Sequence, residues 1–195
     1  MGRRLRLPGE RDVRATLDGS EESDRIVVAC PPHPQHGGGR SDPRLRAVSD
    51  ALGERGIASL RIDYGDWDRG RGEREDAECA LGWAADRFVS TGIFGYSFGA
   101  SVALCAAAEV ERALSGVSAL APAPEIETLD ALSAIGRIDA PVQVLYGPRD
   151  RTVDSRPIAE AVRQRGGVVE ALDADHFFVG KNEGIGDRVA CFFAP

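Results

Sequence analysis

The sequence predicts an α/β protein with a mainly parallel central sheet, helices on both faces, and little or no cap. The uninterrupted apolar run Ile26–Cys30 is typical of a strand that is buried on both faces, and Val142–Tyr146 has the composition of a further strand. Segments of helical period separate these runs, and strands that alternate with helices form parallel sheets. Because the connections are short, we expect residues 1–195 to form a single domain without an inserted one.

The first part of the chain is divided by proline and glycine. Pro8-Gly9 separates two expected strands, 3–7 and 11–17, and a polar turn then leads to the strand at Ile26–Cys30. Residues 31–41 contain three prolines and three consecutive glycines, so we expect no regular structure there.

A helix is expected directly after this loop. Asp42 is a suitable N-cap, and Pro43 suits the first helical position because its missing N–H would have no partner there. A buried strand at 57–62 and a helix at 73–88, with alanines along one face, complete the first half of the chain.

The second half repeats the alternation of strand and helix. We expect strands at 91–94, 116–120, 142–146 and 168–172, and helices at 98–110, 155–165 and 184–193. Residues 121–140 have a weaker pattern, from which we expect one or two helical turns at 128–135.

The charge balance argues against several classes of partner. The chain has 24 basic and 31 acidic residues, a net charge of −7, and no basic cluster long enough to predict nucleic-acid binding. No apolar run approaches the roughly 20 residues that cross a bilayer, and the N-terminus lacks the apolar stretch of a secretory leader. We therefore expect a cytoplasmic protein with a small-molecule substrate and neither membrane nor nucleic-acid partners. Its oligomeric state is not predicted.

A candidate catalytic motif lies between the strand at 91–94 and the helix at 98–110. Residues 95–99 read Gly-Tyr-Ser-Phe-Gly, the G-x-S-x-G pattern of a serine on a tight strand-to-helix turn. Such a turn strains the serine backbone, and side chains two residues to either side would collide, which requires both glycines. We therefore predict Ser97 as a nucleophile. The alternative is an ordinary turn with a serine cap.

A serine nucleophile needs a base, and the base needs a carboxylate that fixes its tautomer. In proteins with this turn the acid and then the histidine follow the serine along the chain. Of the three histidines, His33, His36 and His176, only His176 comes after Ser97. His176 also follows the last expected strand, where a loop can return it to the serine, so we predict it as the base.

The acid is expected just past the end of the preceding strand, where Asp150 follows Val142–Tyr146. Asp154, Asp173 and Asp175 are the competing carboxylates. Asp175 adjoins His176, but neighbouring side chains in extended backbone point apart. Asp150 is therefore the predicted acid.

Two backbone N–H groups must stabilise the charge that develops on a carbonyl oxygen under attack. Phe98, directly after the nucleophile, is expected to supply one of them, and the loop after Ile26–Cys30 the other. Prolines in that loop cannot donate, and Gln35 follows His33-Pro34, which is similar to the His-Gly pair that precedes the donor in proteins with this serine turn. We therefore predict the N–H of Gln35, with His36 as the fallback.

These motifs together resemble those of the small, capless α/β-hydrolases, the dienelactone-hydrolase-like and serine-aminopeptidase-like groups. The resemblance rests on the following segments: Pro32-His33-Pro34 with Gly37-Gly38, GYSFGA at 95–100, GPRD at 147–150 and ADHFF at 174–178. It covers the chain from about residue 25 onward and implies the α/β-hydrolase fold and a Ser97–Asp150–His176 triad. Dienelactone hydrolases proper use a cysteine nucleophile, so Ser97 argues against that particular reaction.

The predicted function is a serine hydrolase that cleaves a small carboxylic ester or thioester through an acyl-enzyme. Two alternatives remain open: an acyltransferase with the same triad, and a catalytically silent binding module of the same fold. The site requires no cofactor. His33 and His36 are three residues apart, but the sequence offers them no third ligand nearby, so we expect no metal. We expect the substrate pocket to be formed by residues 63–72, residues 121–140 and Phe177-Phe178.

Overall fold

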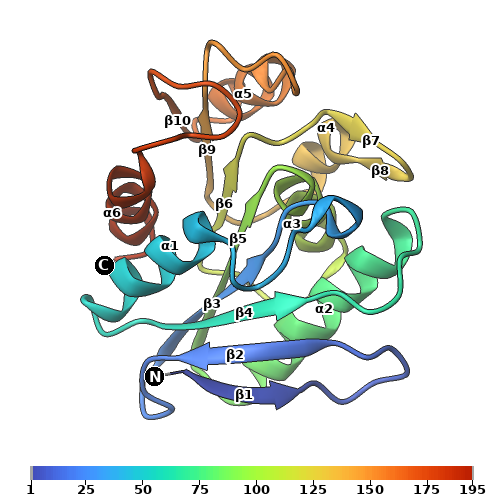
Figure 1. Cartoon of the computed structure of the whole chain (residues 1–195), viewed down its shortest axis with the longest axis vertical. Coiled ribbons are helices and arrows are strands. Elements are labelled where there is room, and N and C mark those ends of the chain that lie inside the picture. The colour runs from blue at the N-terminus through green and yellow to red at the C-terminus, as the bar shows by residue number, and fades with distance from the viewer. Residues whose placement is uncertain (1, 195) are drawn as a thin grey trace.

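An eight-stranded sheet with helices on both faces organises the chain in the computed structural model, which describes residues 2–194 (Figure 1). The strands run in the order β1-β2-β4-β3-β5-β6-β9-β10; β1–β2 and β2–β4 pair antiparallel and all other neighbours pair parallel. Their bounds are β1 Arg3–Arg6, β2 Arg14–Asp18, β3 Arg25–Cys30, β4 Ala58–Asp63, β5 Ser90–Tyr96, β6 Val117–Leu120, β9 Val142–Tyr146 and β10 Val168–Ala171. The predicted fold class is confirmed.

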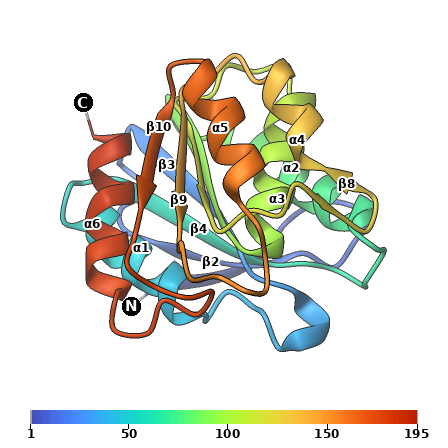
Figure 2. The same ribbon diagram turned by 90° about the horizontal axis from the view of Figure 1, so that it is seen from above.

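Two helices cover one face of the sheet and the others cover the opposite face (Figure 2). The first layer consists of α1 (Pro43–Gly53) and α6 (Asn182–Phe193), and the second includes α2 (Arg71–Ala85), α3 (Phe98–Glu109) and α5 (Arg156–Gln164). Strand β3 shows why both faces need cover: Ile26 and Val28 pack toward the second layer, while Val27 and Ala29 pack toward the first. This double burial accounts for its uninterrupted apolar run.

The start of α1 follows the predicted capping pattern. Asp42 precedes the helix, its Oδ1 accepts the N–H of Arg44 at 2.8 Å, and Pro43 occupies the first helical position. A side-chain cap of this kind stabilises a helix by about 1 kcal/mol. The cap also fixes where α1 begins, which places Arg44 beside the end of β5.

Two of the predicted segments contain elements of another kind than expected, and the strand expected at 11–17 is β2, which begins at Arg14. Residues 31–41 do contain regular structure, a 3₁₀ turn at Pro34–His36 (η1), because Pro34 has the backbone angle that begins such a turn. Residues 128–135 are not simply helical. A small hairpin of β7 (Glu125–Ile126) and β8 (Leu129–Asp130) precedes α4 (Ala131–Ala134) and the 3₁₀ turn η2 (Ile135–Arg137).

The central strands end together at one edge of the sheet. In the register of β3 and β5, Cys30 lies opposite Gly95, so the loop after β3 begins beside the turn that carries Ser97. Strand β5 is longer at both ends than predicted, since β3 and β6 flank it on both sides. Loops at the carboxyl ends of parallel strands are where open α/β sheets place their sites.

No helix among residues 2–194 combines the length and the apolar character that crossing a bilayer would require.

Candidate active site

Ser97 lies on a strained turn between β5 and α3. Its backbone has φ 57° and ψ −121°, in the left-handed region that non-glycine residues rarely adopt. A Cβ on Gly95 would collide with the backbone of Gly99, and a Cβ on Gly99 would collide with the carbonyl oxygens of Cys30 and Pro31. The two glycines of the motif are therefore required by close backbone approach, as the sequence predicts.

Ser97, His176 and Asp150 form one hydrogen-bonded chain. Ser97 Oγ lies 2.9 Å from His176 Nε2, and His176 Nδ1 lies 2.6 Å from Asp150 Oδ2. The side chains of His176 and Asp150 are only 8% and 4% exposed, so water competes little for these contacts. Residues from three separate loops are thus brought together as predicted from their order in the sequence.

The carboxylate of Asp150 is fixed on both sides. While Oδ2 faces His176, Oδ1 accepts the N–H groups of Thr152 at 2.8 Å and Val153 at 2.9 Å. These two bonds hold the carboxylate in place independently of the histidine.

The competing carboxylates all have other partners. Asp154 pairs with Arg156 at 2.7 Å, and Asp173 pairs with Arg149 at 2.8 Å. Asp175 Oδ1 accepts the N–H of Phe177 at 3.0 Å. The structure therefore places Asp150, and none of these three, against His176.

The loop after β3 lies against the serine turn, and several N–H groups of the loop and of the start of α3 form no hydrogen bond. Among the hydrogen bonds of residues 2–194, none is donated by the N–H of Phe98, Gln35 or His33. The N–H of His36 donates to the carbonyl of His33 at 3.0 Å, which removes the fallback donor. Phe98 and Gln35 are thus free to bind a carbonyl oxygen, although Gln35 belongs to the 3₁₀ turn η1.

Aromatic rings gather beside the serine turn. The His33 ring stacks on His36 and packs on Trp67, each at 4.5 Å between centroids, and it lies 4.9 Å from the Phe98 ring. Burial and the neighbouring His36 lower the pKa of His33, which keeps its imidazole neutral at neutral pH. Trp67 also packs on Phe98 at 5.5 Å, so these rings join the loop after β3 to the loop after β4.

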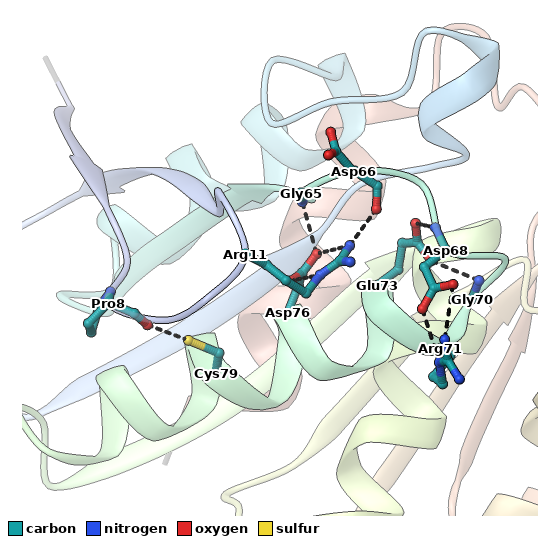
Figure 3. Close-up of polar contacts among 10 residues, drawn as sticks. All are labelled: Pro8, Arg11, Gly65, Asp66, Asp68, Gly70, Arg71, Glu73, Asp76 and Cys79. Carbon is teal, nitrogen blue, oxygen red and sulfur yellow. Dashed lines mark hydrogen bonds and ion pairs between the residues drawn. The ribbon is translucent and has the colours of Figure 1, made fainter.

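The loop that carries Trp67 is held by the buried carboxylate of Asp76 on α2 (Figure 3). Asp76 Oδ2 accepts the N–H of Gly65 at 2.9 Å, and both carboxylate oxygens accept from the guanidinium of Arg11. Arg11 in turn donates to the carbonyl of Asp66 at 2.6 Å. The residues immediately before Trp67 are therefore fixed by an ion pair whose Asp76 side chain is 1% exposed.

Glu73 holds the other end of the same loop. This fully buried carboxylate accepts the N–H of Asp68 at 2.9 Å and that of Gly70 at 2.7 Å (Figure 3). Gly70 has φ 97°, a conformation that favours glycine, and an added Cβ would press on Leu129. Trp67 is thus positioned from both sides by carboxylates of α2.

Among the residues expected to line the substrate pocket, Phe178 is wrong, and the others stay a prediction. Phe177 is 57% exposed beside His176, but Phe178 is fully buried in the core under α6 and cannot line a pocket. Arg11 and Asp76 were not predicted, since nothing in their sequence surroundings marks them as partners.

The fold described above is similar to that of several solved structures. The fold is similar to a lid-less α/β serine hydrolase from Xanthomonas campestris (TM-score 0.82, 23% identity, 98% of this chain and 93% of that one). It is also similar to a dienelactone hydrolase from Anabaena variabilis (TM-score 0.83, 23% identity, 99% and 96% covered). A putative α/β-hydrolase from Agrobacterium tumefaciens gives a TM-score of 0.84 at 23% identity, with 97% and 94% covered.

No protein-family model and no curated protein sequence matches the chain. At these identities the structural likeness defines the fold and not the activity. The chain has the α/β-hydrolase fold in its small form, and within residues 2–194 no separate cap covers the carboxyl edge of the sheet.

Proposed function

We propose that this chain is a serine hydrolase of small carboxylic esters or thioesters, with Ser97, Asp150 and His176 as its catalytic triad. The observation that carries the proposal is the chain of contacts from Ser97 Oγ to His176 Nε2 at 2.9 Å and from His176 Nδ1 to Asp150 at 2.6 Å. The strained backbone of Ser97 supports it, because strain of this kind is concentrated at functional sites.

The first half of the reaction forms an acyl-enzyme. With its Nδ1 proton held by Asp150, His176 presents the Nε2 lone pair to Ser97 and takes the hydroxyl proton as Oγ bonds to the substrate carbonyl carbon. The tetrahedral intermediate then collapses, the bond from carbon to the alcohol oxygen or thiol sulfur breaks, and His176 returns its proton to that leaving group.

The second half releases the acid. Water gives a proton to His176 and bonds to the acyl carbon, and the bond to Ser97 Oγ breaks as the histidine returns the proton to the serine. Nucleophile, base and orienting acid all come from the chain itself, so the proposed mechanism requires no cofactor.

We further propose that Phe98 and Gln35 donate their N–H groups to the oxyanion. The prediction is that Gln35→Pro, which removes the N–H, lowers kcat about 10²–10³-fold, whereas Gln35→Ala keeps most activity because it retains the donor. The prediction is checked by measuring kcat of the two variants and of the parent chain under the same steady-state conditions. Undiminished turnover in Gln35→Pro would contradict the assignment and leave the His33 N–H as the donor from this loop.

The direct test of the function uses a fluorophosphonate probe and a panel of p-nitrophenyl esters and acyl thioesters of increasing acyl length. We expect covalent labelling on the peptide that contains Ser97, together with turnover of the short-chain members of the panel. A protein that takes up no probe and releases no acid from any substrate would be a silent binding module, and the proposed function would be rejected.

A further inference from the structure

The Tyr96 side chain links the nucleophile to the loop that carries the base. Tyr96 directly precedes Ser97, is 2% exposed, and donates its hydroxyl to the main-chain carbonyl of His176 at 2.9 Å. Burial raises the pKa of this hydroxyl to about 12, so it keeps the donated proton at neutral pH. The Tyr96 ring also packs against the rings of His176 and Phe178.

Arg44 supports the same arrangement from helix α1. Its guanidinium lies 4.5 Å above the Tyr96 ring, and its Nη1 donates to the carbonyl of Phe177 at 3.4 Å. The Asp42 carboxylate holds Nη2 at 2.5 Å, and the side chains of Arg44 and Asp42 are only 18% and 8% exposed. The residue that caps α1 therefore also fixes the arginine that reaches the histidine loop.

The histidine loop needs such support because its backbone is strained. Phe178 has φ 51° with its side chain fully buried, and the turn before it is closed by Asp175 Oδ1 accepting the N–H of Phe177. Two successive carbonyls of this loop, those of His176 and Phe177, accept from Tyr96 and Arg44. No contact of either residue reaches the reacting hydroxyl.

We propose that Tyr96 and Arg44 are positioning residues for the reaction, which hold the main chain of His176 so that its ring meets Ser97 and Asp150 together. This inference rests on the proposed function. The two ring contacts, 2.9 Å and 2.6 Å, must form simultaneously for proton transfer, and a small misplacement of a catalytic group can cost up to about 10²-fold in rate. Because Tyr96 adjoins Ser97, one side chain sets the distance between nucleophile and base.

The test begins with Tyr96→Phe, which removes only the hydroxyl. We expect kcat and the rate of fluorophosphonate labelling to fall together by about 10-fold while KM stays nearly constant, and the NMR signal of the proton between His176 Nδ1 and Asp150 to broaden. Tyr146→Phe is the matched control, since the Tyr146 hydroxyl forms no hydrogen bond within residues 2–194.

Arg44→Met should show a smaller loss of the same kind, which Arg44→Lys should only partly restore, because lysine lacks the planar fork.

A double variant separates positioning from a general loss of structure. In the His176→Ala background there is no imidazole to position, so adding Tyr96→Phe should leave the residual rate unchanged. An equal fold loss in both backgrounds, or parental kcat in Tyr96→Phe alone, would overturn the inference. Either result is distinguishable from failure of the proposed function, in which the parent chain itself takes up no probe.

Discussion

Replacing Ser97 with alanine should lower kcat by about 10⁶-fold, the scale observed when the nucleophile of a serine triad is removed, and should abolish fluorophosphonate labelling. The expected cause is loss of the hydroxyl that forms the acyl-enzyme, which leaves His176 and Asp150 with no nucleophile to activate. Stability should change little, since the hydroxyl makes a single side-chain contact, to His176. Turnover kinetics and a thermal unfolding curve measure both effects.

Ser115→Ala is a suitable control for this variant, because Ser115 is exposed just before β6 and its N–H bonds to Thr91 at the start of β5, at the edge of the sheet opposite the site. It should label and turn over like the parent chain. Activity retained in a well-folded Ser97→Ala protein would reject Ser97 as nucleophile, and with it the proposed function.

Replacing Asp150 with asparagine should lower kcat by about 10⁴-fold with little change in KM. The amide can keep the contacts from Thr152 and Val153, but it can also donate to His176 Nδ1, which moves the imidazole proton to Nε2. His176 could then no longer accept the proton of Ser97. Steady-state kinetics on the best substrate of the ester panel provides the comparison.

Two matched substitutions keep this prediction specific. Asp154→Asn and Asp173→Asn remove the same charge from carboxylates that pair only with exposed arginines, so both should retain activity close to the parent. If Asp175→Asn instead proved the most severe of the set, the assignment of the acid would be wrong.

Local chemistry explains which parts of the molecule could be predicted from the sequence. Strand β3 could be predicted because burial on both faces leaves an apolar run, and the start of α1 because Asp42 and Pro43 are adjacent in the chain. Ser97 could be predicted because its turn imposes glycines at fixed spacing. His176 followed from the scarcity of histidines, and its contact with Ser97 is an outcome of the fold rather than of any local pattern.

The remaining features depend on contacts that a local pattern does not show. Strands β7 and β8 have two residues each, too short for a periodicity, and their hairpin is fixed partly by Thr128 bonding to the carbonyl of Arg69. Arg11 and Asp76 meet across 65 residues of sequence. Phe177 and Phe178 are chemically identical neighbours, and the sequence shows neither the positive φ of Phe178 nor that Phe178 is the one that is buried.

The ion pair of Arg11 and Asp76 also bears on how the molecule opens. Chain ends are ordinarily the first parts to fray, but Arg11 lies in the loop between β1 and β2, at the edge of the sheet, and bonds to both Asp76 and the carbonyl of Asp66. Detaching this edge would leave the Asp76 carboxylate without its counter-ion and release the backbone next to Trp67. We therefore expect the edge strands and the loop after β4 to open as one cooperative unit, so that hydrogen exchange at the amides of β2 and of Gly65 shows the same opening event.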